Sequence, residues 1–295
     1  MVQSNVISAP TAGATPKRSE RSIGAILIDA GRLKPQDAER ILHLQREEGL
    51  RFGDAAMKLG LLTNADIDFA LAGQFAYPYL LRGQSAVSEE LVAAYAPFSP
   101  QMEALRALRS QLMLRWFDSD PARKALAIVS AARNEGRSFI AANLAVVFSQ
   151  LGEHTLLIDA DLRHPRQQEL FSLENRAGLS AVLSGRAGAE AIHRIPSLLD
   201  LSVLPAGAQP PNPLELLARS LFPQLLADLA KEFDVIILDS PPASEFADAQ
   251  TLAARAGCAL IVARKNATRI SQVRGVSDTV AQTSATVVGT VLNDF

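Results

Sequence analysis

The chain has 295 residues, of which 48% are hydrophobic and 20% are charged, a globular composition long enough for about two domains. Its 29 basic and 31 acidic side chains argue against a dedicated nucleic-acid-binding domain, which would be clearly basic. The longest apolar runs are far shorter than the roughly 20 residues that a membrane-spanning helix needs. A single cysteine, Cys258, excludes an internal disulfide, and no secretory signal heads the chain. We therefore expect a cytoplasmic protein with no transmembrane segment of its own and no nucleic-acid partner.

Residues 1–20 are rich in Ser, Thr, Ala and Pro without apolar periodicity, which predicts a disordered arm. Residues 21–80 predict a helical module built on a tandem repeat, because a shift of 29 positions superposes many identical residues. The superposed pairs are Gly24 and Gly53, Gly31 and Gly60, Leu33 and Leu62, Leu42 and Leu71, and Gln45 and Gln74. Each copy is typical of two short helices separated by a glycine stop. Residues 81–100 mix Pro, Gly and Ser and predict a connector.

Residues 101–295 predict an α/β domain. It begins with an amphipathic helix, EALRALRSQLMLRWF, whose apolar positions are Leu105, Leu108, Leu112 and Trp116. Short apolar runs then alternate with helical stretches, and the runs are ALAIVS, HTLLIDA, LDLSVLP, FDVIILDS, CALIVA and TVVGTVLN. Continuous apolar strands of this kind predict a parallel sheet with helices on both faces.

The segment SAARNEGRS lies between the first predicted strand and a long helix, where helix N-terminal amides bind phosphate. Gly136 permits close backbone approach, Asn134 tolerates positive φ, and Ser138 offers a hydroxyl to Mg²⁺. Against the pattern G-x-x-x-x-G-K-[ST], Ala131 replaces the first glycine and Arg137 replaces the lysine. Arginine can grip phosphate bidentately but is not equivalent to lysine. We therefore expect nucleotide binding to survive and phosphoryl transfer to be slower or lost.

Three acids follow two of the predicted strands. Asp159 and Asp161 lie in LLIDADLR, and Asp239 lies in VIILDSPP. A lone Asp at a strand end is usually a turn or helix cap, but the carboxyl ends of parallel strands gather at one edge of a sheet. Together with the loop, the acids predict magnesium-assisted phosphoryl transfer.

These motifs, with P-P-N-P-x-E-L-L at Pro210–Leu217, resemble the bacterial tyrosine kinases (BY-kinases) of capsule and exopolysaccharide synthesis. Those kinases belong to the deviant P-loop NTPase class, which also contains the ParA and MinD ATPases. The resemblance runs from about Gln101 to Asp294 and implies ATP and Mg²⁺ as cofactors. The chain is most similar to the EpsG-type chain-length determinant kinases of exosortase-linked clusters, which also place a helical module before the kinase-like domain.

The resemblance implies Arg137, Asp159, Asp161 and Asp239 as catalytic residues, with Asp161 orienting or deprotonating the acceptor hydroxyl. It implies Ser138, Asp159 and Asp239 at the metal. The implied nucleotide-binding residues are Arg133, Asn134, Glu135, Gly136, Arg137, Ser138, Phe139 and Asn293. Arg133 adds a second positive charge to the loop, or is simply solvated. Asn293 lies where related ATPases place a base-reading asparagine, and a turn residue fits equally well.

Two further features bear on assembly and on the acceptor. Glu103, Arg106 and Arg109 match the E-x-x-R-x-x-R helix that mediates ring-like self-association in relatives, although a solvated charge cluster would have the same spacing. The family usually carries a tyrosine-rich C-terminal tail that is phosphorylated, but no tyrosine follows Tyr95 in these 295 residues, so we expect no phosphorylation of such a tail. Tyr77 and Tyr79 lie at the end of the helical module, a position that favours packing roles for both. A tyrosine substrate would then be another protein or the chain's own connector.

The repeat also resembles the N-terminal domain of type II secretion and pilus ATPases. The cyclic di-GMP-binding form of that domain has two 24-residue motifs five residues apart, and positions 22–45 and 51–74 fit this spacing. The implied ligand residues are Arg21, Gly24, Gly31, Gln45, Arg51, Gly53, Gly60 and Gln74. Ser22 stands where that family has arginine at the head of the first copy. A protein-docking or purely structural module is the alternative.

The leading prediction is an ATP-binding, tyrosine-kinase-like component of exopolysaccharide synthesis, export and chain-length control. Its implied partner is a membrane chain-length regulator, which would hold it at the inner face of the membrane, and it is expected to form a homo-oligomer. One alternative is a catalytically weak, nucleotide-dependent assembly switch of the same complex. The other is a ParA- or MinD-like positioning ATPase.

Overall fold

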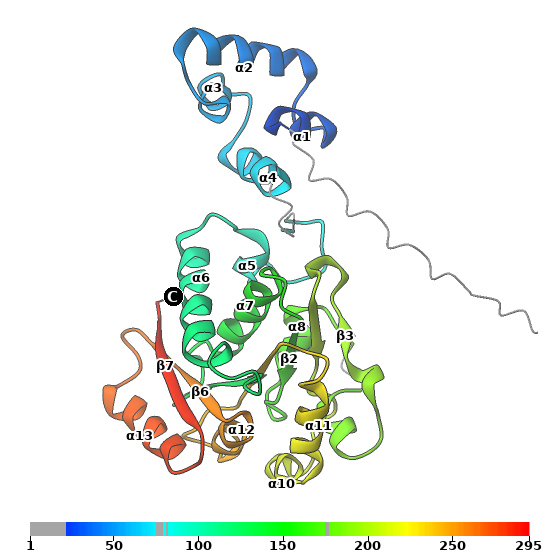
Figure 1. Ribbon diagram of the computed structural model, residues 1–295, viewed down its shortest axis with the longest axis vertical. Helices are drawn as coiled ribbons and strands as arrows, with labels where there is room; N and C mark the ends of the chain where they lie inside the picture. The colour runs from blue at the N-terminus through cyan, green and yellow to red at the C-terminus, as the bar shows by residue number, and fades with distance from the viewer. Residues whose placement is uncertain (1–21, 75–78, 81, 175–176, 295) are drawn as a thin grey trace, which may run out of the picture. The chain divides into compact units, whose positions relative to one another are not determined.

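The computed structural model describes residues 22–74, 79–80, 82–174 and 177–294 (Figure 1). The chain divides into two compact units, Met1–Tyr77 and Pro78–Phe295. The predicted arm, Arg21 and Tyr77 lie outside the described residues. The described part of the predicted connector belongs to the second unit. No helix among the described residues is both long and apolar enough to span a bilayer.

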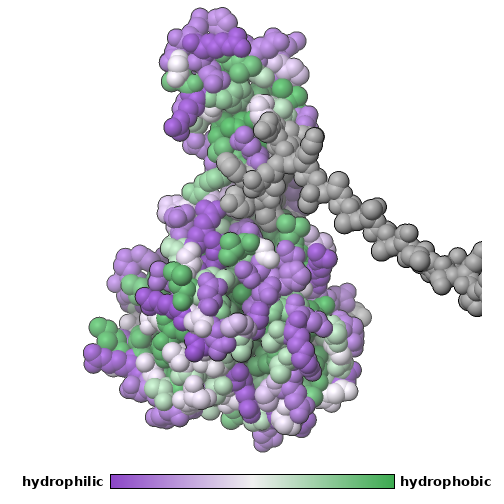
Figure 2. All heavy atoms as spheres, viewed as in Figure 1, coloured by the Kyte–Doolittle hydropathy of each residue, from purple (hydrophilic) through white to green (hydrophobic). Residues whose placement is uncertain are grey.

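The first unit is helical. Its helices are α1 (Ile23–Asp29), α2 (Pro35–Glu48), α3 (Phe52–Lys58) and α4 (Asn64–Gln74). Helix α1 packs on α4 and α2 packs on α3, so the first helix of each repeat copy contacts the second helix of the other copy. The core between them consists of Leu27, Leu33, Ala38, Ile41, Ala55, Ala56, Leu62 and Ala70. Hydrophilic side chains cover the outer side of α2 (Figure 2).

The repeated glycines of this unit have two structural roles. Gly31 and Gly60 follow helices with φ of 68° and 65°, a conformation that other residues adopt only with strain. Gly24 and Gly53 lie at helix contacts: an added Cβ would come within 3.3 Å of the Phe52 ring and of the Ile67 side chain, respectively. The spacing of the repeat therefore follows from helix termination and helix packing.

The second unit opens with α5 (Val92–Tyr95) and α6 (Pro100–Leu112). The helix predicted after residue 101 changes at its end into a π-helical turn, Met113–Phe117, which buries Trp116 and Phe117. The segment around α5 packs on α7 (Arg137–Ser149), where the Asn143 side chain accepts a hydrogen bond from the Ala93 amide (2.9 Å).

The described residues of the second unit form one seven-stranded sheet in the order β3-β4-β2-β5-β1-β6-β7. The strands are β1 (Ala125–Ser130), β2 (Thr155–Asp159), β3 (His193–Arg194), β4 (Leu201–Leu204), β5 (Val235–Asp239), β6 (Cys258–Arg264) and β7 (Thr286–Asn293). Every pairing is parallel except that of β3 with β4. All six predicted runs are strands, whereas the short edge strand β3 was not predicted.

Helices cover both faces of the sheet, so the predicted fold class is confirmed (Figure 1). Alternate residues of β1 enter different cores: Leu126 and Ile128 pack on the α7 side, and Ala127 and Val129 pack on the opposite side. The other helices are α8 (Gln167–Leu170), α9 (Leu179–Leu183), α10 (Pro213–Ala218), α11 (Leu221–Leu229), α12 (Asp248–Ala256) and α13 (Ile270–Ala281), with 3₁₀ turns at Ala189–Ala191 and Pro196–Leu198.

Candidate functional site

The predicted phosphate loop joins β1 to α7. Asn134 and Gly136 have φ of 59° and 96°, so the two residues chosen from the sequence for backbone freedom are the ones that turn the loop. Gly136 is also the N-cap of α7, whose first amides have no partner within the helix. The loop therefore ends at the positive end of a helix dipole, as an anion site requires.

Glu135 holds the loop to the rest of the domain. Its buried carboxylate accepts hydrogen bonds from the Ala132 amide (2.7 Å) and from the Thr268 hydroxyl, which follows β6. Its carbonyl accepts one from the Asn293 side chain (3.2 Å) at the end of β7. We predicted Glu135 to bind nucleotide, but its side chain points into the protein.

Arg137 is buried, and its guanidinium is bonded to its own surroundings. Nε donates to the Ser240 carbonyl (2.8 Å), and Nη1 donates to the Ala132 carbonyl (2.6 Å) and to the Ser130 hydroxyl. Burial lowers the pKa of Arg137, and the charge of Asp239 opposes this shift. To grip a phosphate, the guanidinium would have to exchange some of these oxygens for phosphate oxygens.

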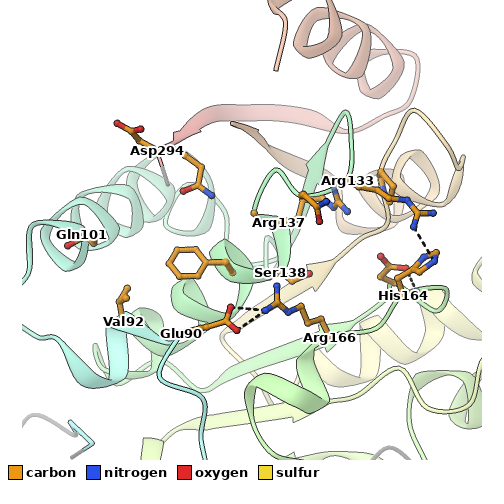
Figure 3. A pocket seen from close by; sticks show the side chains of 15 residues that line it. Glu90, Val92, Gln101, Arg133, Arg137, Ser138, His164, Arg166 and Asp294 are labelled. Atoms are coloured by element: carbon orange, nitrogen blue, oxygen red, sulfur yellow. Dashed lines mark hydrogen bonds and ion pairs between the residues drawn. The ribbon is translucent and has the colours of Figure 1, made fainter. Parts of the chain in front are cut away.

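A cavity of about 700 Å³ opens beside the loop (Figure 3). Its lining consists of Glu90, Val92, Gln101, Arg133, Asn134, Gly136, Arg137, Ser138, Phe139, Asp161, His164, Arg166, Pro242, Asn293 and Asp294. Among the predicted nucleotide-binding residues, Glu135 is the one that does not line it. Glu90, Val92 and Gln101 were missed, because they come from the predicted connector and the following helix, where no motif marks them.

Ion pairs border this cavity. Glu90 and Arg166 meet through two contacts of 2.7 and 2.8 Å (Figure 3). Arg133 binds both oxygens of Glu245, with a shortest contact of 2.7 Å, and its Nη1 lies 3.3 Å from Nε2 of His164. The positive charge that Arg133 brings to the loop is therefore largely offset by Glu245.

Asp159 is fully buried at the end of β2 and organises the chain that follows. One carboxylate oxygen accepts the Asp161 amide (3.2 Å), and the other accepts the amides of Arg166 and Gln167 (both 2.9 Å). This network presents Asp161 at the cavity, where its own carboxylate accepts two further backbone amides. Burial and the nearby Asp239 raise the pKa of Asp159 well above its usual range.

Asp239 lies beside Asp159, because the two are paired in the register of β2 and β5. Its Oδ2 accepts a hydrogen bond from the Gln167 side chain (2.8 Å). Its Oδ1 is buried, and no described residue gives it a hydrogen bond of regular geometry. Burial raises the pKa of Asp239, while the Ser138 hydroxyl and the charge of Arg137 oppose the rise. A buried carboxylate with an oxygen that lacks a regular hydrogen bond, beside a serine hydroxyl, fits a hard cation such as Mg²⁺.

Gln167 and the pair Arg163–Asp248 also support the site and were not predicted. Gln167 links the two strand ends, because its side chain also donates to the Ser138 carbonyl (3.2 Å). Arg163 contacts the buried Asp248 at 3.2 Å and lies over the Phe246 ring at 4.0 Å. A single Gln or Asp outside a motif gives no sequence signal, and these contacts join segments far apart in the chain.

The remaining predicted residues lie elsewhere. On α6, Arg106 contacts Glu103 at 3.5 Å and donates to the Tyr79 hydroxyl (2.8 Å), and Arg109 donates to the Val147 carbonyl (2.9 Å). In the helical unit, the described residues implied for cyclic di-GMP include the glycines explained above by packing and turns. The others are Gln45, Arg51 at the N-cap of α3, and Gln74 at the end of α4.

Comparison with known proteins places this site in a family. No protein-family model matches the chain. The tyrosine-protein kinase YwqD of Bacillus subtilis is 34% identical over 209 residues, which cover 71% of this chain and 87% of that protein. The kinase domain of the Escherichia coli tyrosine kinase ETK superposes with a TM-score of 0.67 and 30% identity, covering 72% of this chain and 82% of that one. The cell-division ATPase MinD of Pyrococcus furiosus gives a TM-score of 0.51 and 25% identity over 58% of this chain and 72% of that one.

The kinase relatives match more of the chain, at higher identity, than MinD does. The chain therefore belongs to the bacterial tyrosine-protein kinases, within the wider MinD-like P-loop fold.

Proposed function

We propose that the chain is a protein tyrosine kinase of exopolysaccharide synthesis and chain-length control, which transfers the γ-phosphoryl group of Mg-ATP to a tyrosine hydroxyl. The observation that carries this proposal is the buried carboxylate of Asp239, which lies next to the Ser138 hydroxyl at the end of the phosphate loop and whose Oδ1 has no hydrogen bond of regular geometry. Membership of the tyrosine-kinase family supports the choice of acceptor.

The residues have distinct roles in this proposal. Ser138 and Asp239 would hold Mg²⁺, with Asp159 behind them fixing the loop that carries Asp161. Bound Mg²⁺ would neutralise charge on the phosphates. The α7 amides would bind phosphate oxygens, and Asn293, which lines the cavity, would contact the base. Asp161 reaches the cavity and would orient or deprotonate the incoming tyrosine hydroxyl.

A membrane chain-length regulator is the proposed partner, whose cytoplasmic segment would bring the kinase to the inner face of the membrane. Self-association through Glu103, Arg106 and Arg109 belongs to the same proposal. Arg106 supports it, because 28% of its side chain is exposed and it lies beside Glu103, whose side chain is 77% exposed. Arg109 instead donates to the Val147 carbonyl of α7, so its role would be to hold α6 against α7.

A nucleotide-dependent assembly switch is the second candidate, and Arg137 favours it. Its guanidinium is committed to the Ser240 and Ala132 carbonyls, whereas a P-loop lysine would present a small mobile charge to the phosphates. A switch would bind and release ATP without transferring its phosphate to tyrosine.

One experiment separates kinase from switch. The purified full chain is incubated with radiolabelled ATP and the regulator's cytoplasmic segment, and both phosphotyrosine and free phosphate are measured. The kinase proposal expects labelled phosphotyrosine that disappears with Ser138→Ala. Tight ATP binding without phosphotyrosine on any protein of the complex would instead establish the switch.

A further inference from the structure

The three tyrosines of the chain differ in their suitability as phosphate acceptors. Tyr95 is buried, and its hydroxyl donates to the Val87 carbonyl (2.5 Å), so its oxygen is enclosed in the fold. Tyr77 lies outside the described residues. Tyr79 is half-buried at the start of the second unit, and its hydroxyl already contacts a cation.

That cation is Arg106 of α6. Its Nη2 donates to the Tyr79 hydroxyl at 2.8 Å, and its Nη1 lies 3.5 Å from the Glu103 carboxylate. The Arg106 side chain is 28% exposed and Tyr79 is half-buried, so a phosphate on the phenolic oxygen would lie beside a partly exposed guanidinium. A guanidinium binds phosphate through two parallel hydrogen bonds and prefers it to a neutral phenol.

The chain position of Tyr79 is fixed by the fold. The amide of the next residue, Leu80, donates to the carbonyl of Ala94 in α5 (2.8 Å). The adjacent α5 segment is in turn held on α7 by Asn143 and by Gln150, whose side chain donates to the Ala93 carbonyl (2.8 Å). Tyr79 is therefore anchored on the same helical layer that carries the phosphate loop at its start.

We propose that Tyr79 is a phosphorylation site of this protein, modified by a second copy of the chain, and that Arg106 binds the phosphate formed. The proposal rests on the proposed kinase function. The bond between the γ-phosphorus and the β–γ bridging oxygen of ATP breaks, and a bond from the γ-phosphorus to the Tyr79 oxygen forms. The phenolic proton leaves through the base at the donor's active site, and ADP departs.

Transfer between copies is inferred from where Tyr79 contacts α6. Gln101, near the start of α6, lines the cavity, whereas Arg106 is five residues further along, about 7.5 Å along the helix axis. The Tyr79 hydroxyl is held at Arg106 and is not among the described groups that line its own cavity. The phenol would therefore enter the cavity of another copy.

The added charge would also act on self-association. A phosphate on Tyr79 would draw Arg106 away from Glu103, and both residues belong to the predicted self-association helix. Phosphorylation would in this way change the surface that copies of the chain present to each other.

The test maps the phosphate directly. The full chain is incubated with Mg-ATP and the regulator's cytoplasmic segment, with a random glutamate–tyrosine copolymer added as an external acceptor in a parallel sample, and tryptic peptides are sequenced by mass spectrometry. Tyr77 and Tyr79 share the peptide 59–82, but fragmentation before Pro78 separates them. We expect the phosphate on the fragment that begins at Pro78, its loss in Tyr79→Phe, and unchanged labelling in Tyr95→Phe. Labelled copolymer with no phosphate on Tyr79 overturns this inference alone, and no label on either acceptor overturns the kinase proposal as well.

Two further measurements test the partner copy and Arg106. Neither Tyr79→Phe nor Asp239→Asn should label itself, but their mixture should label the Asp239→Asn chain at Tyr79. An unlabelled mixture contradicts transfer between copies. In the phosphorylated parent, a ³¹P titration should show phosphotyrosine losing its second proton at lower pH than in Arg106→Gln, because the guanidinium favours the dianion. Equal titrations would show that Arg106 does not bind the phosphate.

Discussion

The helical unit, residues 22–74, contains glycines at a fixed spacing, whereas the phosphate loop, residues 130–138, contains the single glycine Gly136, and the glycines of the two regions have different roles. In the helical unit, Gly24 and Gly53 allow helices to touch, and Gly31 and Gly60 end them. In the loop, Gly136 turns the chain into the N-terminus of α7, at the wall of a cavity.

The surroundings of these glycines separate a packing motif from a binding motif. Around the loop, charged side chains from several strands and loops converge, and one buried carboxylate oxygen of Asp239 lacks a regular hydrogen bond. In the helical unit, the partly buried Arg32 has its partners within the unit: it pairs with Asp66 at 2.8 Å and lies over the Phe69 ring at 4.4 Å. A glycine pattern indicates a ligand site only when unsatisfied polar groups accompany it.

The largest expected effect is that of Asp239→Asn. It keeps the size of the side chain and an oxygen for Gln167 but removes the negative charge beside Ser138. We expect Mg-ATP affinity to fall by about 10–100-fold, the range seen when groups that support a metal are lost. Isothermal titration with and without Mg²⁺ measures this loss. An unchanged affinity would remove Asp239 from the site.

The same variant has an opposite effect on stability. Burial raises the pKa of Asp239 above 3.8, so the folded state binds this proton more tightly than the unfolded state does. The free energy of unfolding therefore falls as pH rises from the pKa of Asp239 in the unfolded chain through its higher pKa in the folded protein, because the ionised carboxylate is buried. In Mg²⁺-free buffer, Asp239→Asn should raise Tm at pH 7, with little difference near pH 3. Mg²⁺ affinity of the parent should rise with pH across the same window.

The second prediction concerns packing in the helical unit. Gly53→Leu would force a side chain against Ile67 and should lower the free energy of unfolding of this unit by about 2 kcal/mol, as overpacking does. Hydrogen exchange in residues 22–74 measures the loss. Gly275→Leu in α13 is the matched control, since an added Cβ there meets no atom within 4 Å.

Nucleotide affinity provides the other half of this test. It should be unchanged in Gly53→Leu, because the residues that line the described cavity belong to the second unit. A parallel loss of affinity would show that the helical unit supports the nucleotide site. Normal exchange in the helical unit would show that Gly53 is not needed for packing.

The sequence predicted the parts of the fold that rest on local patterns. The buried strands are continuous apolar runs, and the acids at their ends mark the ligand edge of a parallel sheet. Strand β3 has two residues and lies antiparallel on an edge, so it carries no comparable pattern.

The direction of a side chain is set by distant partners, which limits prediction of the site. Glu135 and Arg137 flank Gly136 in the phosphate motif, but distant residues set their directions. The Glu135 carboxylate accepts a hydrogen bond from the Thr268 hydroxyl, and the Arg137 guanidinium donates to the Ser240 carbonyl. Glu90 reaches the cavity only because the α5 segment packs on α7. The spacing of residues in the sequence predicts none of these contacts.

A smaller effect is expected at the cavity border. Glu245→Gln removes the charge that holds Arg133 and should let its guanidinium meet the phosphates. Because both side chains are exposed, at 47% and 37%, solvent screens the pair and its contribution is small, so ATP affinity should rise by only a few-fold. The gain should shrink at high salt. Lowered affinity would mean that Glu245 itself supports the nucleotide, and Arg133→Gln should cancel the gain if Arg133 causes it.

The smallest expected effect is that of cyclic di-GMP on the helical unit. Four of the eight residues that the motif implies are glycines, which the packing and turns of the helices already explain, and Ser22 caps α1 where the motif has arginine. We therefore expect a flat isotherm when the full chain is titrated with cyclic di-GMP, with Mg-ATP as the positive control on the same sample. A saturable signal that Arg51→Ala abolishes would reverse this expectation. It would also show that an exposed arginine at the start of α3 can form a ligand site together with glycines whose first role is helix packing.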